Sequence, residues 1–74
     1  MSHLKLTAII EREGDGFMSF CPELDIASQG DSRAEARANL IEAVQGFLEA
    51  ADKSEVQQRL GNERYVEQLE VKVG

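Results

Sequence analysis

Apolar and polar residues alternate along the first part of the chain. Between residues 4 and 12 every second side chain is apolar, which is the period of a β-strand with one buried face. The residues on this face are Leu4, Leu6, Ala8 and Ile10. Residues 13–16, EGDG, predict a hairpin turn because glycine tolerates positive φ and aspartate suits tight turns. A second strand is then expected over residues 17–21, ending at Pro22 because proline donates no hydrogen bond to a sheet.

The period changes after Gly30. Residues 24–29 predict a third, shorter strand, and Gly30 breaks it. Ser32 and Glu35 then form the pattern S-x-x-E, a capping box in which each side chain accepts a hydrogen bond from a backbone N–H at the start of a helix. A helix is expected over residues 33–51, and its apolar stripe comprises Ala36, Leu40, Ala43, Val44, Phe47 and Leu48. The sequence thus gives Gly30, Ser32 and Glu35 a structural role.

The last third of the chain predicts one more helix and one more strand. Ser54, with Gln57 three residues later, indicates the start of a short helix over residues 55–60 that Gly61 closes. Residues 64–73 alternate again and predict a fourth strand, with one face formed by Tyr65, Leu69, Val71 and Val73. We therefore expect one domain over residues 1–74 with an α+β fold, β-β-β-α-α-β. Its three-stranded antiparallel meander would carry the long helix on one face.

Length and charge narrow the classes of function. A chain of 74 residues buries only a thin core, which argues against a large internal active site. The net charge is −6, from 14 acidic and 8 basic residues, and the basic residues form no cluster that would neutralise phosphates. We expect no direct binding of nucleic acid. A basic protein is a better partner for an acidic surface, and the alternative that the acids serve only solubility stays open.

The sequence also carries information on location. No apolar run approaches the roughly 18–20 residues that span a bilayer, so no membrane association is expected. The first ten residues, MSHLKLTAII, lack the long apolar core and the cleavage site of a signal peptide. Cys21 is the only cysteine, which fits a reducing compartment. We therefore expect a cytoplasmic protein.

Catalytic chemistry finds little support among the residues. His3 is the only histidine and lies near the N-terminus, so Cys21 and the serines lack an obvious general base. Cys21 is expected to be a small buried hydrophobe. The alternating acids Glu11, Glu13 and Asp15 leave a magnesium-dependent nuclease of ribonuclease-H type as the least favoured alternative. We expect no enzyme, no catalytic residue, no metal and no cofactor.

One stretch of the sequence is more specific than its parts. Residues 21–51, CPELDIASQGDSRAEARANLIEAVQGFLEAA, resemble the HicB antitoxin family. That family carries a Pro-acid-Leu step after a strand, then S-x-G-[DE]-[ST]-x-x-E-A, then a helix with a second E-A. The matching residues are Pro22, Glu23, Leu24, Ser28, Gly30, Asp31, Ser32, Glu35, Ala36, Glu42 and Ala43. The opening LTAIIEREGDGFMSF and the closing YVEQLEVKV also resemble the family's first hairpin and last strand.

The resemblance implies a fold and a partner. The HicB N-terminal domain is a partial ribonuclease-H-like fold, and its usual role is to bind and inhibit HicA, a small basic toxin that cleaves messenger RNA. Many family members continue into a C-terminal DNA-binding domain. This sequence ends at Gly74, directly after the expected fourth strand, so operator binding is not carried over.

We expect the toxin to contact an acidic region. The candidate contact residues are Glu11, Glu13, Asp15, Glu23 and Asp25, together with Glu42 on the helix. The runner-up hypothesis is an orphan regulatory or structural module with a different partner. Self-association into a dimer or higher oligomer is expected from the small size and the exposed strand edges.

Overall fold

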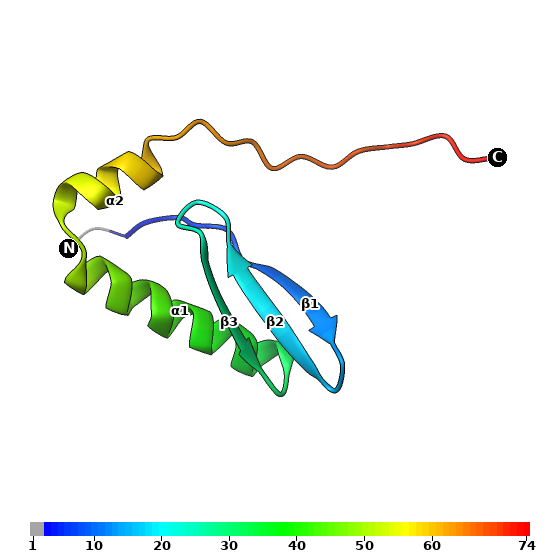
Figure 1. The fold of residues 1–74 in the computed structure, drawn as a ribbon. Helices are drawn as coiled ribbons and strands as arrows, with labels where there is room; N and C mark the ends of the chain where they lie inside the picture. The colour runs from blue at the N-terminus through cyan, green and yellow to red at the C-terminus, as the bar shows by residue number, and fades with distance from the viewer. Residues whose placement is uncertain (1–2) are drawn as a thin grey trace.

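The α+β class and the order of the first five elements agree with the prediction. The computed structural model describes residues 3–74 (Figure 1). Three strands form an antiparallel sheet in the order β1-β2-β3, and two helices follow. The elements are β1 (Ile9–Glu13), β2 (Gly16–Cys21), β3 (Ile26–Gly30), α1 (Arg33–Ala50) and α2 (Lys53–Leu60).

The first strand is shorter than predicted because its partner ends early. Strand β1 pairs with β2 from Ile9 opposite Phe20 to Glu13 opposite Gly16. The predicted start at Leu4 is wrong: residues 3–8 overhang the end of β2 and form no regular structure. Pro22 cannot donate to a ladder, and β2 turns away there.

The third strand starts two residues later than predicted for a related reason. The turn between β2 and β3 occupies residues 22–25, where Leu24 is fully buried and Asp25 adopts a positive φ of 56°. Strand β3 then pairs antiparallel with β2, from Ile26 opposite Cys21 to Gly30 opposite Phe17. The predicted meander is confirmed.

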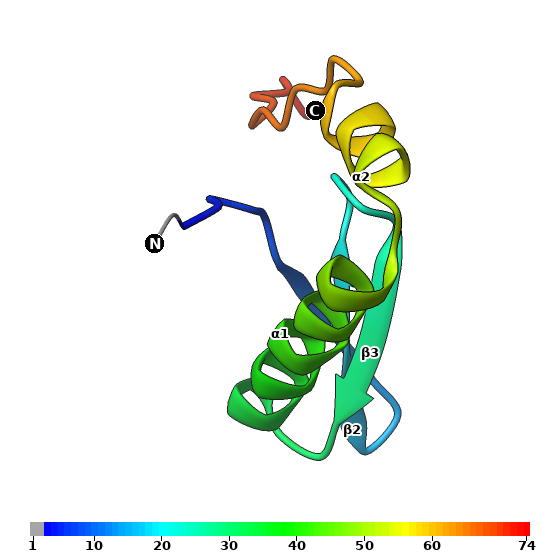
Figure 2. The ribbon, with the colours of Figure 1, turned by 90° about the vertical axis from the view of Figure 1, so that its left-hand side faces the viewer.

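Helix α1 covers one face of the sheet (Figure 2). Cys21, Leu24, Leu40 and Val44 form the buried core, and Phe47 and Leu48 pack against it. The predicted apolar stripe of the helix therefore faces the sheet. Ser19 is also fully buried, and its hydroxyl donates a hydrogen bond of 2.8 Å to the carbonyl oxygen of Ala36. This bond satisfies the polar group and ties β2 to the helix.

The capping box is confirmed at the start of α1. Ser32 is the N-cap, and its hydroxyl accepts from the backbone N–H of Glu35 at 3.0 Å. The Glu35 carboxylate accepts in return from the N–H of Asp31 at 2.8 Å. Gly30 brings strand and helix together: a Cβ at this position would lie 2.5 Å from the backbone nitrogen of Ala36. Only glycine fits there without a shift of the backbone.

The second helix starts two residues earlier than predicted, at Lys53. Its N-cap is Asp52, so the prediction that Ser54 caps this helix is wrong. The chain turns between the two helices at Ala51, which has an extended backbone and ends α1. The predicted end is confirmed, because the N–H of Gly61 bonds to the carbonyl oxygen of Gln57.

The predicted fourth strand is absent from the sheet. Residues 63–74 extend away from the sheet and the two helices and have no regular secondary structure (Figure 1). We call residues 63–74 the tail and the sheet with its helices the body. The Leu69 and Val73 side chains are 87% and 90% exposed. Alternation gives a segment two faces, but a strand also needs a neighbouring backbone to pair with.

Candidate functional site

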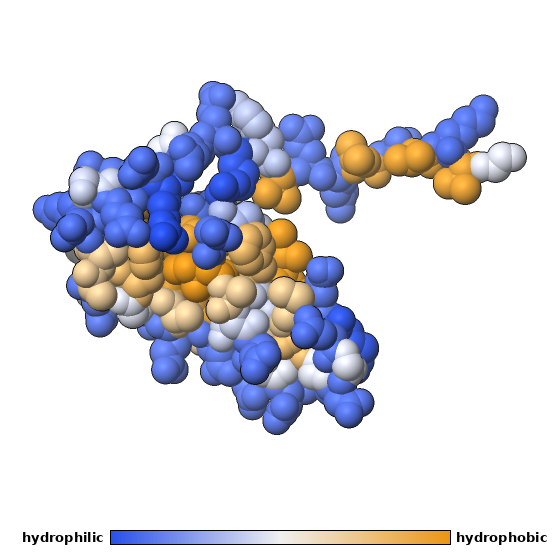
Figure 3. Space-filling model, in the orientation of Figure 1, coloured by the Kyte–Doolittle hydropathy of each residue, from blue (hydrophilic) through white to orange (hydrophobic). Residues whose placement is uncertain are grey.

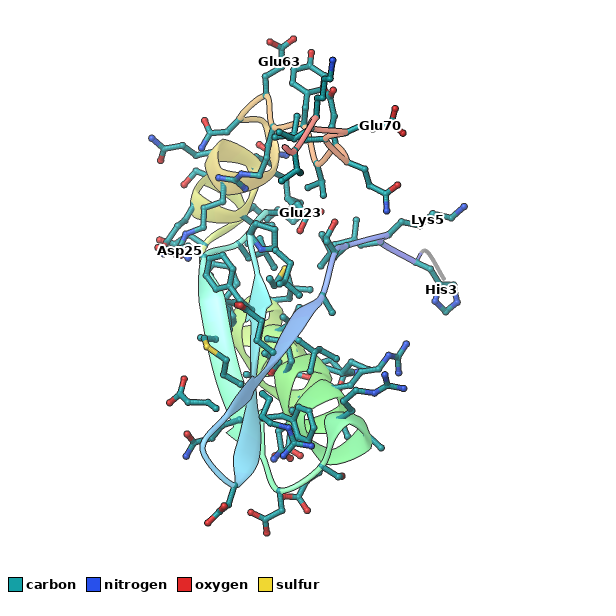
Figure 4. All side chains as sticks on the ribbon, turned by 90° about the vertical axis from the view of Figure 1, so that its right-hand side faces the viewer. His3, Lys5, Glu23, Asp25, Glu63 and Glu70 are labelled. Carbon is teal, nitrogen blue, oxygen red and sulfur yellow. The ribbon has the colours of Figure 1, made fainter. Side chains whose placement is uncertain are left out.

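The predicted acidic residues lie at two ends of the sheet. Asp15 is in the turn between β1 and β2, whereas Glu23 and Asp25 are in the turn between β2 and β3. The six residues of β2 separate these turns by roughly 20 Å. Figure 4 places Glu23 and Asp25 together at the end of the sheet near α2. The expectation of one continuous acidic region is therefore corrected.

Glu23 has a structural role at its end of the sheet. Its carboxylate accepts from the backbone N–H of Thr7 at 3.0 Å and from the Thr7 hydroxyl at 2.6 Å. Partial burial opposes ionisation of Glu23, but the hydrogen bonds to its carboxylate, those from Thr7 foremost, together outweigh burial and lower the pKa of the carboxyl. Glu23 thus holds the N-terminal overhang against the turn at residues 22–25.

Two arginines compensate the charge at this same end. Arg59 of α2 donates to the carbonyl oxygen of Leu24, forms an ion pair with Glu55 at 3.1 Å, and stacks 4.6 Å from the centre of the Phe47 ring. Arg64 donates to the carbonyl oxygen of Pro22. Glu23 and Asp25 therefore lie beside two guanidinium groups, which makes this end less attractive to a basic partner.

Carboxylates gather at the opposite end of the sheet. The turn between β1 and β2 meets the connection from β3 to α1 there, because Phe17 pairs with Gly30. We call this region the acidic end, and it comprises Glu11, Glu13, Asp15, Asp31 and Glu35. A shallow groove of about 560 Å³ there is lined by Glu13, Asp31, Glu35 and Asn39, among others. All five carboxylates are exposed, while the basic residues at this end are Arg12 and Arg33.

The outer face of the sheet adjoins the acidic end. Figure 4 shows the sheet in front of α1 on this side, with no helix covering it. The strand register places Glu11 beside Met18 and Ile9 beside Phe20, on the face opposite to Ser19 and Cys21. Arg12 points to the helix face instead, where its guanidinium lies 4.7 Å from the centre of the Phe17 ring. Within the strands, the charged residues of the outer face are thus Glu11 and Glu13. This surface combines an apolar centre with an acidic border.

Glu42 does not join this surface. It is exposed on α1, and a rotation of about 100° per residue points it away from the buried Leu40 and Val44. The helix lies on the other side of the sheet from the outer face (Figure 2). Asp31 and Glu35 lie at the acidic end but were not among the acidic residues that the sequence grouped together. The place of Asp31 directly after the Gly30 break, beside the helix start, was the available signal.

Cys21 is 1% exposed, and burial raises the pKa of its thiol. Its predicted burial is confirmed. Within residues 3–74 no three His, Cys, Asp or Glu side chains are placed to share a metal ion. Neither described helix is both long and apolar enough to cross a membrane.

Comparisons with known proteins give one relative. No family model and no solved structure matches the chain. The UPF0150 protein ssl0738 of Synechocystis sp. is 49% identical over 47 residues. The aligned stretch covers 61% of this chain and 65% of the length of that relative. The name of that relative states no activity. The comparison shows that this chain is similar to a UPF0150 protein over more than half of this chain's length.

Proposed function

We propose that this chain is an antitoxin domain that binds and inhibits a small basic ribonuclease of the HicA type. It acts by protein–protein contact and not by catalysis. The observation that carries the proposal is the acidic end, where five exposed carboxylates lie beside an uncovered sheet face. The motif over residues 21–51, which resembles the HicB family, supplies the identity of the partner.

The electrostatics favour the acidic end over the turn at residues 22–25. At that turn Glu23 is engaged by Thr7, and Arg59 and Arg64 lie beside it. At the acidic end all five carboxylates are exposed, and within residues 3–74 only that of Glu35 has a structural role, since it accepts from the N–H of Asp31. An exposed negative surface accelerates the encounter with a positively charged protein and also competes with RNA for the same basic groups.

The outer sheet face supplies the part of the interface that excludes water. Ile9 is 41% exposed, and Met18 and Phe20 are half-buried on the same face. Protein interfaces combine such an apolar centre with a polar rim, and aromatic and methionine side chains are enriched in them. We expect Phe20 and Met18 to lie near the centre of the contact and Glu11 and Glu13 at its border.

The proposal is tested by recovery of the partner from native cells. The tagged chain is captured together with its bound proteins, which are then identified by mass spectrometry. A small basic protein in stoichiometric amount, whose RNA cleavage stops when this chain is added, supports the proposal. Recovery of this chain alone contradicts it and favours the orphan module that associates with itself.

The contact surface is tested with matched charge changes. The double variant Glu13→Gln/Asp15→Asn removes two charges from the acidic end, and Glu42→Gln/Glu49→Gln removes two from the exposed side of α1. We expect the first pair to slow association with the captured partner, most strongly at low salt, and the second to change it little. Equal effects of the two pairs would move the contact away from the acidic end.

A further inference from the structure

The tail, residues 63–74, carries apolar side chains that the sheet and helices do not cover. Its residues on one face are exposed in water: Tyr65 by 72%, Leu69 by 87%, Val71 by 69% and Val73 by 90%. In Figure 3 hydrophobic side chains follow one another along this extended segment. Ordinary surface residues of this kind are scattered, whereas a regular series marks a binding segment.

The β1 edge of the sheet can receive a further strand. Strand β1 is the edge strand of the sheet, and its outward side pairs with no other strand within residues 3–74. Together with the N-terminal overhang it offers a stretch of extended backbone over residues 4–13, the same length as residues 64–73. At the opposite edge, a side chain of α1 already occupies β3, because Asn39 donates to the carbonyl oxygen of Gln29 at 2.8 Å.

An apolar groove lies beside the N-terminal overhang, the segment that leads into β1. It lies between the N-terminal overhang and α1, has a volume of about 780 Å³, and is lined mainly by Leu4, Leu6, Leu40, Ile41, Val44 and Leu48. Leu4 and Ile41 are 54% and 42% exposed. Figure 3 shows hydrophobic side chains gathered on the body between α1 and the tail. A strand added beside β1 would direct every second side chain into this groove.

We propose that residues 64–73 of a second copy of this chain bind as a strand along the β1 edge. Leu69, Val71 and Val73 of the second copy then fill the groove, and its backbone pairs with the unpaired side of β1. The exchange is reciprocal, so each copy gives one tail and receives one, as in a two-fold symmetric dimer.

The course of the tail favours a second copy over the chain's own body. Arg64 bonds to the carbonyl oxygen of Pro22, which fixes the start of the tail beside the turn at residues 22–25. From there the tail runs clear of its own sheet in both views (Figures 1 and 2). Strand addition of this kind uses main-chain hydrogen bonds for affinity and alternate side chains for specificity. The inference stands whether or not the chain inhibits a toxin.

The first test is the oligomeric state in solution. Light scattering after size exclusion is expected to give a dimer for the full chain. The variant Leu69→Asp/Val71→Asp changes the face that enters the groove and is expected to give a monomer. Its control, Val66→Asp/Gln68→Asp, adds the same two charges to the other face and is expected to stay dimeric. A monomeric full chain, or a dimer that survives Leu69→Asp/Val71→Asp, overturns the proposal.

The second test identifies whose tail fills the groove. One tagged chain carries Val71→Cys, a differently tagged chain carries Leu4→Cys, and the two are co-expressed and treated with a short bis-maleimide. Buried Cys21 is left in place, and circular dichroism checks that each variant is folded. Cross-linking between the two tags supports the exchange. An intramolecular product from a single chain with both substitutions, without cross-linking between tags, shows that the chain's own tail folds back and overturns it.

Discussion

Two segments of this chain have the same alternation of apolar and polar residues, but only one of them pairs in the sheet. Residues 4–13 and residues 64–73 both alternate between apolar and polar side chains. In the first, residues 9–13 pair with β2 across a tight turn, whereas residues 63–74 pair with no strand in the part of the chain that the structure describes. The difference shows that alternation specifies an extended segment with two faces, and that a nearby backbone decides whether it becomes a strand.

The largest difference in loss of stability is expected between an apolar side chain of the core and an apolar side chain of the tail. Leu40→Ala removes a side chain that is 3% exposed in the core and is expected to lower the free energy of unfolding by about 2–5 kcal/mol. Leu69→Ala, at a position that is 87% exposed, is expected to change that free energy by at most about 0.5 kcal/mol. Urea denaturation at low protein concentration, where copies are separate, measures both. Equal losses would mean that the tail packs on its own body.

Two glycines are expected to change the stability of the protein in opposite directions when each is replaced by alanine. Gly30→Ala places a Cβ against the backbone of Ala36 and is expected to cost about 1–3 kcal/mol. At Gly46, in the middle of α1, a Cβ would meet nothing within 4 Å, so Gly46→Ala is expected to stabilise the protein by about 0.5–1 kcal/mol. Thermal unfolding followed by circular dichroism compares the two. A stabilising Gly30→Ala would contradict the close approach of β3 and α1.

Ser32 and Ser54 were both predicted to be helix N-caps, and replacing each by alanine tests whether the cap is formed. Ser32→Ala removes the hydroxyl that accepts from the N–H of Glu35 and is expected to cost about 1 kcal/mol. Ser54→Ala lies inside α2, where Asp52 is the N-cap, and is expected to be neutral or slightly stabilising. Both variants are measured by urea denaturation under one condition. A comparable loss of unfolding free energy in Ser54→Ala would indicate that Ser54, and not Asp52, is the N-cap of α2.

The smallest change in stability is expected from the bond between Glu23 and Thr7, which attaches the N-terminal overhang, residues 3–8, to the turn at residues 22–25. The pKa of Glu23 is lowered in the folded protein from its ordinary value of 4.5, because the hydrogen bonds to its carboxylate, those from Thr7 foremost, together outweigh burial. Glu23 therefore contributes stability at pH above its ordinary value, and the contribution is lost as the pH falls through the lower folded value. Stability measured against pH is expected to fall less steeply below pH 4.5 in Glu23→Gln than in the unchanged chain.

The amide resonance of Thr7 provides a local readout of the same bond. It is expected to move as Glu23 becomes protonated and to stay fixed in Glu23→Gln. A Thr7 resonance that is insensitive to pH in the unchanged chain would show that the carboxylate does not hold the overhang.

Sequence reasoning located most elements of the sheet and helices, but it did not show how the acidic residues are divided over the molecule. The meander, both helices and the cap at Ser32 follow from local signals whose partners lie within a few residues, whereas the close approach of β3 and α1 at Gly30 was not predicted. The acidic candidates were assigned to one region because their charges are alike. Their separation follows from the antiparallel register, which sends the turn with Asp15 and the turn with Glu23 to opposite ends of β2. The engagement of Glu23 by Thr7, sixteen residues away, had no sequence signal.

The sequence by itself determined the order of the first five elements, the helix start at Ser32 and the apolar side of α1. These properties depend on backbone conformation and on the period of side chains, which neighbouring residues set. Only the tertiary structure decided that the strand pairing of β1 begins at Ile9, that the carboxylates divide between two ends, and that residues 64–73 remain outside the sheet. These outcomes depend on which distant backbones and charges meet, and no local pattern specifies such contacts.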